Sequence, residues 1–491
     1  MKGTLLQSFH WYTEGEGKHW KKLKAQLDEL KKWGITAMWL PPAYKSASGD
    51  VSVGYDVYDL FDLGEFDQKN SVVTKYGTKE EYLALTEKMH ELHMEIYPDI
   101  VMNHKMGADE KEKVKVIKVE EEDRLKYDGE PFEAEIYTKF TFPGRDKKYS
   151  EFIWDFQCFT GIDYVAEPEQ TGIFKILNQY GDNWQEEVDD ENSNYDYLMG
   201  ADIDFRNPNV VAELKYWGKW YYDTIHFDGV RLDALKHLPA NHMVEWLDYI
   251  RAEVRPDCFA VGEYWTPEHE TLVKYIDETE GKMHLFDVPL HDKFHEASEQ
   301  GTDFDLSTLF DKTLIQSNPD NAVTLVANHD TQPLQALEAP VAPWFKPLAY
   351  AIILLRPFGY PCVFYPDVYG AEYVDKGEDG NDHQITMPKI DCLPKLLEAR
   401  QQFVSGEYVE FFDHPNCVAW WNKGENEENG SIVILSNGED GFKDISLGEN
   451  YVHQVFVDYL GNVEEEVTVG DDGMARFLTK GGSVSVWIRK K

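Results

Sequence analysis

The chain has 491 residues, of which 42% are hydrophobic and 14% aromatic, enough for a large core and for more than one domain. Its formal net charge of −42 would repel DNA, RNA and anionic membranes, so the composition argues against nucleic-acid and membrane partners. The five cysteines are widely separated and form no Cys-x-x-Cys pair, which indicates neither a disulfide framework nor a zinc site.

The N-terminal segment carries no apolar signal core and runs directly into a strand pattern. No run of about 18 or more apolar residues follows anywhere in the chain. We therefore expect a cytoplasmic protein that does not span a membrane, and we expect it to be a monomer.

Strand and helix patterns alternate along most of the first 400 residues, which predicts a parallel sheet. The predicted strands are Thr4–His10, Ile35–Leu40, Glu95–Asn103, the first half of Phe227–His237, Phe259–Glu263, His284–Val288, Ala322–Ala327 and Cys362–Tyr365. The predicted helices are Trp20–Trp33, Lys79–Leu92, Asn209–Ile225, His242–Val254, Glu268–Ile276, segments up to Ser317, and Trp344–Leu355. This count is that of an α/β protein with a (β/α)₈ TIM barrel.

Two stretches break the alternation. Between about 105 and 201 the chain has mixed charges, Gly and Asp clusters and short aromatic strands, and beyond about 408 it has short alternating runs between turns. We therefore assign 1–104 and 205–400 to the barrel, 105–204 to an inserted β-rich domain after strand three, and 401–491 to a C-terminal antiparallel β-sandwich domain.

Polar residues at the C-terminal ends of barrel strands are the candidates for catalysis. Three carboxylates, Asp233, Glu263 and Asp330, stand at the ends of strands four, five and seven and should meet above one barrel mouth. Two carboxylates with separated pKa values are what glycoside hydrolysis requires.

The neighbours of these carboxylates indicate their roles. Arg231 lies two residues before Asp233 on the same strand face, so it should lower the pKa of that carboxyl and favour a nucleophile. Glu263 stands among apolar and aromatic neighbours that should raise its pKa, as a general acid needs. His104 and His329 could bind sugar hydroxyls, although for either histidine taken alone a structural role is favoured.

Four ordered motifs resemble the signature regions of the alpha-amylase family of glycoside hydrolases, and the resemblance covers essentially the whole chain. The motifs are Asp99-Ile-Val-Met-Asn-His104, Gly229-Val-Arg-Leu-Asp233, Val261-Gly-Glu263 and Ala327-Asn-His-Asp330. Further stretches, such as Gly54-Tyr-Asp-Val-Tyr-Asp-Leu60, are similar to the cytoplasmic and liquefying bacterial members.

The resemblance implies retaining endo-hydrolysis of internal α-1,4-glucosidic bonds in starch, glycogen or maltodextrins, through a covalent glycosyl-enzyme intermediate. It implies that Asp233 is the nucleophile, Glu263 the acid/base and Asp330 the transition-state stabiliser. It also implies substrate contacts from Tyr55, His104, Arg231, Lys236, His237 and His329.

A structural calcium ion is a second expectation. Asn103, Asp163, Asp196, Asp202 and Asp204 carry the oxygen donors that calcium prefers, although an Asp-rich loop is often only solvated. The resemblance places Asn103, Asp196, Asp202 and the backbone carbonyl of His237 around a calcium that ties the insertion to the barrel. Gln185 stands where related enzymes with additional metals carry an Asp, which argues against those further metals.

Two alternatives remain open. A transglycosylating or α-1,6-acting member of the same family would carry the same carboxylates, and its products would distinguish it. A non-catalytic glucan-binding protein is the alternative from another class, and the presence of all three carboxylates and Arg231 argues against it.

Overall fold

Parallel strands form a closed barrel at the centre of the molecule. The computed structural model describes residues 3–425 and 429–490. In this part of the chain eight parallel strands close in the order β1-β16-β15-β14-β13-β12-β5-β2. Their bounds are β1 (Leu5–Gln7), β2 (Ala37–Leu40), β5 (Glu95–Ile100), β12 (Gly229–Leu232), β13 (Phe259–Gly262), β14 (His284–Phe286), β15 (Ala322–Leu325) and β16 (Tyr360–Phe364).

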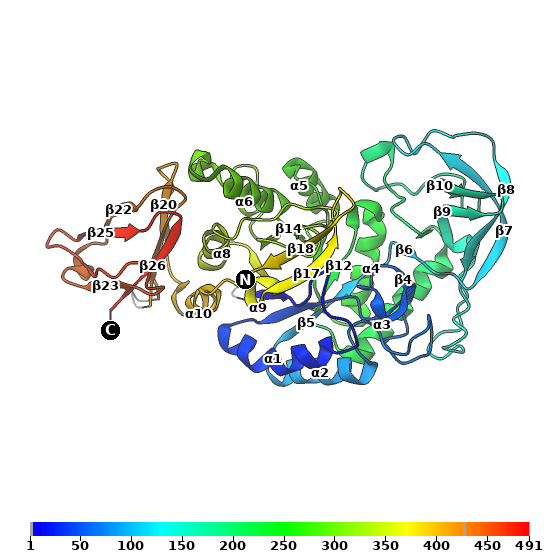
Figure 1. The fold of residues 1–491 in the computed structure, drawn as a ribbon, viewed down its shortest axis with the longest axis horizontal. Helices are drawn as coiled ribbons and strands as arrows, with labels where there is room; N and C mark the ends of the chain where they lie inside the picture. Colours follow the sequence, from blue (N-terminus) through cyan, green and yellow to red (C-terminus); the bar gives the residue numbers. More distant parts are fainter. Residues whose placement is uncertain (1–2, 426–428, 491) are drawn as a thin grey trace.

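Helices surround the barrel and lie between consecutive strands (Figure 1). They are α1 (His19–Trp33), α2 (Lys79–Glu91), α3 (Pro208–Ile225), α4 (Ala240–Glu253), α5 (His269–Glu278), α6 (Val288–Gln300), α7 (Leu314–Ser317), α8 (Lys346–Leu355), α9 (Tyr365–Tyr369) and α10 (Leu393–Phe403). Helix α8 is buried along its whole length, because it lies between the barrel and the C-terminal sheet strand β26.

Local sequence signals set the helix ends. Helix α1 stops at Gly34, whose φ of 104° is a left-handed conformation that favours glycine. Helix α2 begins with a capping box, in which the Thr78 side chain accepts from the Glu81 backbone N–H and the Glu81 carboxylate accepts from the Thr78 N–H. Helix α3 begins with Asn207 as its cap and Pro208 in the first turn.

The insertion after β5 is an antiparallel sheet beside one end of the barrel, at the right of Figure 1. Within the described residues it has six strands, in the order β6-β11-β9-β10-β7-β8. Their bounds are β6 (His104–Lys105), β7 (Glu110–Val119), β8 (Phe132–Lys139), β9 (Phe159–Ala166), β10 (Glu169–Ile176) and β11 (Ala201–Ile203). The insertion therefore leaves and re-enters the barrel next to the C-terminal end of β5.

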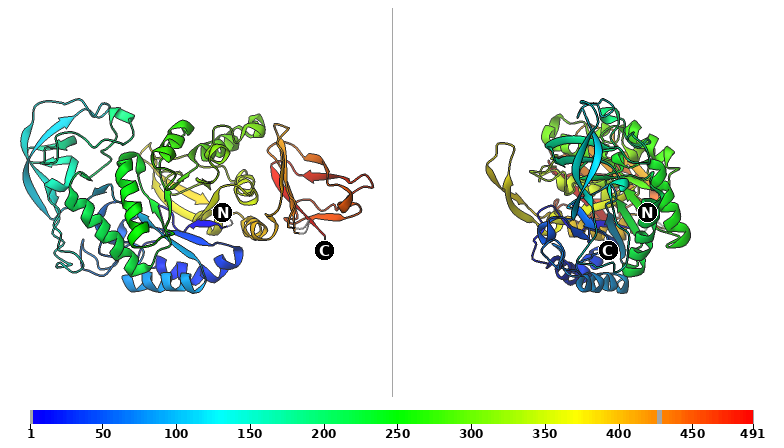
Figure 2. Two further views of the ribbon diagram at one scale, coloured as in Figure 1. Left: turned by 180° about the vertical axis from the view of Figure 1, so that it is seen from behind. Right: turned by 90° about the vertical axis from the view of Figure 1, so that its right-hand side faces the viewer.

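The C-terminal region forms two antiparallel sheets at the opposite end of the molecule (Figures 1 and 2). A buried apolar cluster that includes Trp421, Phe477 and Trp487 lies among their strands. The first sheet has the order β19 (Tyr408–Phe411), β20 (Cys417–Asn422), β21 (Ser431–Ser436), β26 (Ser483–Arg489), β23 (Val455–Asp458) and β24 (Val467–Thr468), and the second pairs β22 (Gly441–Ser446) with β25 (Met474–Thr479).

The predicted fold class is confirmed, namely a (β/α)₈ barrel with an inserted β sheet after the third strand and an antiparallel C-terminal region. The sequence analysis missed the hairpin of β17 (Ala371–Lys376) and β18 (Asp382–Met387), which projects from the barrel in the right-hand view of Figure 2. It also missed the short pair β3 (Lys45–Ser46) and β4 (Val57–Asp59).

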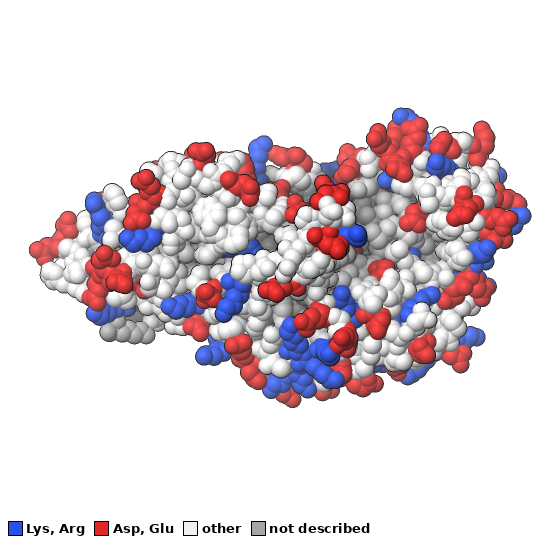
Figure 3. Space-filling view, viewed as in Figure 1, with Lys and Arg blue, Asp and Glu red and all other residues white. Residues whose placement is uncertain are grey.

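Charged side chains of both signs are scattered over the face shown in Figure 3, with acidic groups prominent on the inserted sheet. The same view shows a recess between the barrel and the insertion. Among the described residues no helix combines the length and apolar character that crossing a bilayer requires.

Candidate active site

One arginine contacts several carboxylates at the barrel mouth. Arg231, near the end of β12, is fully buried. Its Nη1 donates to Asp99 Oδ1 at 2.8 Å and to Asp233 Oδ1 at 2.6 Å, and its Nη2 lies 3.5 Å from Glu263 Oε2. These carboxylates come from the C-terminal ends of β5, β12 and β13, so the register of the parallel sheet brings them together.

The turn after β12 fixes the orientation of Glu263. Ala234 follows Asp233 and has a left-handed backbone (φ 53°, ψ 42°), which is uncommon for a residue with a side chain. In this conformation the Ala234 N–H donates to Glu263 Oε2 at 2.8 Å, and the Leu235 N–H donates to the Glu263 carbonyl at 2.9 Å. A Cβ on Gly262 would lie 2.0 Å from Leu235 Cδ1, so a larger residue here would displace the Leu235 side chain from this turn.

Burial governs the ionisation of both carboxyls. Removal from water raises the pKa of Glu263 to about 8, against the opposing charge of Arg231. Burial also raises the pKa of Asp233, and the Arg231 charge and hydrogen bond only partly offset it. The sequence-based expectation was therefore right in direction for Glu263 and wrong in net direction for Asp233, because it counted the arginine and not the desolvation.

Asp330 follows β15 and faces the same mouth. Burial raises its pKa to about 7, with Arg231 acting in the opposite direction. His329 Nε2 lies 3.3 Å from Asp330 Oδ2, and the Asp330 N–H donates to Asn328 Oδ1 at 2.9 Å. The three predicted carboxylates therefore share one electrostatic environment around Arg231.

Aromatic rings line one wall of the mouth. The Tyr55 ring stacks on His329 with centroids 5.1 Å apart, and Trp11 stacks on Tyr55 at 6.0 Å. Tyr55 Oη donates to Asp99 Oδ2 at 2.8 Å, and the Gln7 amide lies 2.9 Å from His329 Nδ1. A stacked wall of this kind offers a flat apolar face beside the carboxylates.

The remaining predicted contacts lie around this mouth. His104 Nε2 is 2.8 Å from the backbone carbonyl of Tyr55, so its ring holds the loop that carries that tyrosine. Lys236 Nζ donates to Glu191 at 2.5 Å, and His237 Nδ1 is 2.7 Å from the Tyr195 carbonyl. Lys236 and His237 therefore join the barrel to the insertion.

Asp99 and Trp11 are neighbours of the site to which the sequence analysis gave no role. Asp99 is fully buried, accepts from Arg231, Tyr55 and the Trp39 indole, and has a pKa raised to about 6 by burial. Asp99 belongs to the motif Asp99–His104. It faces Arg231 in the register of β5 and β12, and this position was the signal that could have identified it as a site residue. Trp11 belongs to a loop with no regular pattern, so nothing in the sequence indicated its stacking.

The predicted metal ligands lie on and beside β6, β9 and β11, and they differ in their hydrogen-bond partners. Asn103 Nδ2 donates to Asp202 Oδ1 at 3.2 Å, and Thr160 donates to the other Asp202 oxygen. Asp196 accepts only from Gln185, through its backbone N–H at 3.0 Å and its amide at 2.9 Å.

Asp204 and Asp163 have other partners. Arg206 donates to both oxygens of Asp204 at 2.8 Å, and Asn178 adds a third bond at 2.8 Å. Asp163 accepts from the Gly200 N–H at 3.1 Å. Among the described residues no three His, Cys, Asp or Glu side chains are arranged as a ready metal cage.

Two buried carboxylates nevertheless have no cationic side chain as a direct partner among the described residues. Burial raises the pKa of Asp196 to about 7 and that of Asp202 well above its ordinary value, and the charges of neighbouring acids raise both further. Together with the Asn103 amide they offer the oxygen donors that a hard divalent cation prefers, so this donor set fits calcium.

Comparisons with known proteins agree with this geometry. Residues 7–391 match the family described as "Alpha amylase, catalytic domain". The chain is 54% identical to the "Cytoplasmic alpha-amylase" of Escherichia coli (strain K12), over 99% of this chain and 98% of that protein. It is 44% identical to an "Alpha-amylase" of Geobacillus stearothermophilus, over 100% of this chain and 87% of that protein.

A solved structure shares the fold at low sequence identity. The alpha-amylase of Geobacillus thermoleovorans, determined in complex with acarbose, aligns with a TM-score of 0.63 and 17% identity, over 100% of this chain and 98% of that one. At this identity the likeness concerns the fold alone.

Proposed function

The chain belongs to the alpha-amylase family of glycoside hydrolases, and we propose that it hydrolyses internal α-1,4-glucosidic bonds in starch, glycogen or maltodextrins with retention of configuration. The observation that carries the proposal is the sharing of one buried guanidinium by Asp233 and Glu263. Two carboxyls of unequal pKa beside one scissile bond are what the retaining reaction needs.

In this proposal Glu263 is the general acid and Asp233 the nucleophile. A pKa of about 8 keeps Glu263 protonated near neutral pH, so that it can give its proton to the leaving glucosyl oxygen. Asp233 attacks the anomeric carbon and forms a glycosyl ester, with Arg231 holding the attacking carboxylate. Water, deprotonated by the ionised Glu263, then cleaves the ester and restores both groups.

The other site residues bind and orient the sugar. Asp330 accepts hydrogen bonds from hydroxyls of the sugar that reacts, and His329 donates to them. His104 donates its Nε2–H to the Tyr55 carbonyl and so acts on the sugar by holding the Tyr55 loop. Tyr55 supplies the ring on which that sugar stacks, and its place in the aromatic wall beside Trp11 supports this role. Lys236 and His237 contact the leaving-group side, and Arg231 orients the nucleophile.

Calcium, when bound, would supply a structural charge rather than chemistry. The residues that would hold it are Asn103, Asp196, Asp202 and the His237 carbonyl, because they join the insertion to the barrel. Asp163 and Asp204 stay weaker candidates, since Arg206 already neutralises Asp204. Gln185 gives Asp196 two uncharged donors, which supports one metal rather than a cluster.

The domain boundaries and the cellular location remain proposals. We propose a barrel of residues 1–104 and 205–400, an insertion of 105–204 and a C-terminal domain of 401–491, acting as a monomer. The name of the Escherichia coli relative supports a cytoplasmic location.

Product analysis tests the activity. Chromatography of digests of soluble starch should show short maltooligosaccharides without new branch points, and the first products should keep the α configuration by NMR. Asp233→Asn should lower kcat by roughly 10⁴-fold or more with unchanged circular dichroism. New α-1,6 linkages, β-configured products or near wild-type activity of the variant would each contradict the assignment.

A further inference from the structure

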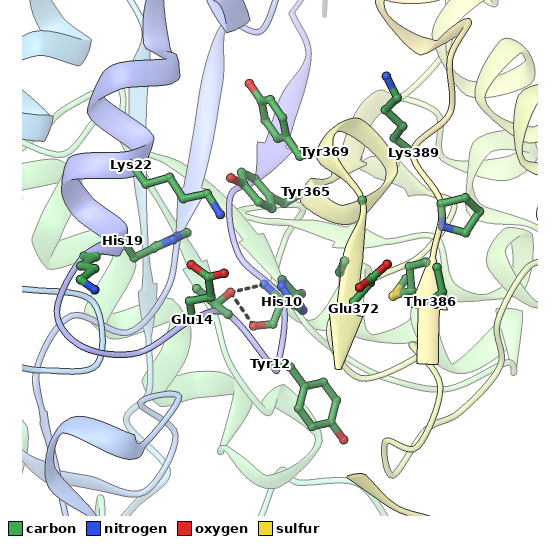
Figure 4. A pocket seen from close by; sticks show the side chains of 16 residues that line it. His10, Tyr12, Glu14, His19, Lys22, Tyr365, Tyr369, Glu372, Thr386 and Lys389 are labelled. Carbon is green, nitrogen blue, oxygen red and sulfur yellow. Dashed lines mark hydrogen bonds between the residues drawn. The ribbon is translucent and has the colours of Figure 1, made fainter. Parts of the chain in front are cut away.

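A cavity outside the catalytic mouth opens between the β1–α1 loop and the β17–β18 hairpin (Figure 4). Its volume is about 460 Å³, within the range of small-molecule sites. His10 and His19 form its floor, helix α9 supplies Tyr365 and Tyr369, and strand β17 supplies Glu372. None of the residues assigned to catalysis above lines it.

Aromatic rings supply flat apolar surface to the cavity. Tyr365 and Tyr369 lie side by side with centroids 4.9 Å apart, and both line the space. Tyr12 borders it from the β1–α1 loop and stacks on Tyr373 of the hairpin at 3.8 Å. The rings are therefore held in place by neighbouring structure before any ligand arrives.

Polar groups around the cavity keep unused hydrogen-bonding capacity. His10 is only 8% exposed, and its Nδ1 has no hydrogen-bond partner. Within the described chain the carboxylates of Glu14 and Glu372 take part in no salt bridge, although both line the space. Lys22 reaches over the Tyr365 ring at 5.8 Å and points inward, as Figure 4 shows.

These groups are suited to a neutral, hydroxyl-rich molecule. Carboxylates accept hydrogen bonds, an ammonium donates them, and an imidazole does either, so the set can satisfy hydroxyls in both directions. A simple anion would meet the two carboxylates, and a simple cation would meet Lys18, Lys22 and Lys389, which also line the space. The tyrosine rings add surface for the apolar face of a sugar ring.

We propose that this cavity is a second saccharide site that holds a short α-glucan segment apart from the cleaved bond. The choice of an α-glucan rests on the proposed function, whereas the preference for a neutral polyhydroxyl ligand rests on the cavity itself. Bound at this place, a second segment of a long glucan keeps the polymer attached while the cleft turns over.

The cavity wall also contacts the catalytic face. Tyr12 Oη accepts from the Gln335 amide at 2.7 Å and donates to Asp375, and the neighbouring Trp11 N–H donates to Gln332 Oε1 at 3.1 Å. Gln332 and Gln335 belong to the segment that follows Asp330. The second site therefore lies on the same loop that carries Trp11 into the mouth.

Calorimetry with sulfur-linked maltotriose, which the enzyme does not hydrolyse, tests the proposal. Wild-type protein should bind two equivalents, and the double variant Glu14→Gln/Glu372→Gln should bind one. The control Glu80→Gln, on an exposed position of α2, should still bind two. One equivalent in wild type, or two in the double variant, would overturn the proposal.

Kinetics provide the second readout. The double variant should raise KM for soluble starch several-fold and leave kcat and the hydrolysis of a short chromogenic maltoside unchanged. An equal loss on both substrates would mean that the cavity only supports the cleft, and displacement of the second equivalent by inorganic phosphate would mean an anion site. Both results contradict the proposal, whereas wild-type protein inactive on starch contradicts the proposed function instead.

Discussion

Two buried clusters of acidic side chains differ in what neutralises them. At the barrel mouth, Asp233 and Glu263 share the guanidinium of Arg231. In the insertion, Asp196 and Asp202 receive hydrogen bonds from amides and a hydroxyl, and within residues 3–425 and 429–490 neither is paired with a cationic side chain. The first cluster carries its counter-charge within the chain, and the second leaves room for a cation from solution.

This difference suits the first cluster to a reaction and the second to metal-dependent stability. A fixed guanidinium keeps its position through a reaction, so it can hold carboxyls whose charge changes at each step. Carboxylates held by neutral donors stay costly to bury until a cation arrives, and binding then becomes part of the folding free energy. The predictions below alter one cluster at a time.

The largest effect should follow from removing the shared cation. Arg231→Met leaves buried acids without their counter-charge, which should lower the free energy of unfolding by about 3–5 kcal/mol and kcat/KM by on the order of 10³-fold. Thermal unfolding and starch hydrolysis measure the two effects.

The matched control is Arg145→Met. Arg145 is also buried, and its Nε lies 2.8 Å from Asp59 Oδ2, in a part of the molecule outside the mouth. The control should lose stability and retain kcat in the surviving folded protein. An equal loss of kcat in both variants would remove the special role of Arg231.

Glu263→Gln should remove the titrating proton of this carboxyl while the fold is retained. The folded-state pKa of about 8 exceeds the ordinary 4.5, so the stability from this group is full below about pH 4.5 and is lost as pH rises through 8. The variant should be inactive, and its Tm should fall less than that of wild type between about pH 4.5 and pH 8. Identical pH profiles of Tm would argue against the raised pKa, and Glu95→Gln serves as the control.

Removal of calcium should act on the second cluster alone. A metal present at 100 times its Kd stabilises by about 2.7 kcal/mol, so a chelator should lower the Tm of wild-type protein by several degrees. Asp202→Asn should abolish this sensitivity to chelator, whereas Asp109→Asn, elsewhere in the insertion, should keep it. A wild-type midpoint that is indifferent to the chelator would argue against the site.

The smallest effect is expected where an acid faces water. Lys111 and Glu135 lie 2.7 Å apart across β7 and β8, with side chains 40% and 37% exposed. Because solvent screens such pairs, Glu135→Gln should leave Tm and activity unchanged within error in calorimetry and starch assays. A clear drop in Tm would show that position on the sheet, rather than burial, determines how much these acids contribute to stability.

The sequence was sufficient for the architecture and for the main carboxylates. Period-two and helical patterns located the barrel strands within a few residues, and strand ends pointed to Asp233, Glu263 and Asp330 because parallel strands end at one face. The β17–β18 hairpin escaped because Ala371–Lys376 is a largely exposed strand without a strong apolar alternation.

The pKa values and charge partners of buried acids were harder to predict from the sequence, because they depend on segments that are distant along the chain. The pKa direction of Asp233 depends on burial by the whole mouth, which local neighbours do not reveal. The partner of Asp204 is Arg206, two residues along the chain, yet only the fold shows that this pair is satisfied while Asp196 and Asp202 are not. Local patterns therefore identify the groups, and three-dimensional packing sets their charge.

The left-handed turn at Ala234 has a mechanical consequence. Its N–H holds the carboxyl of Glu263, and the same residue is covalently attached to Asp233. The proposed nucleophile and the proposed acid are thus connected at this turn by one covalent link and one hydrogen bond. A movement of the chain at this turn displaces both reactive groups at once, so their mutual spacing is inherited from the backbone.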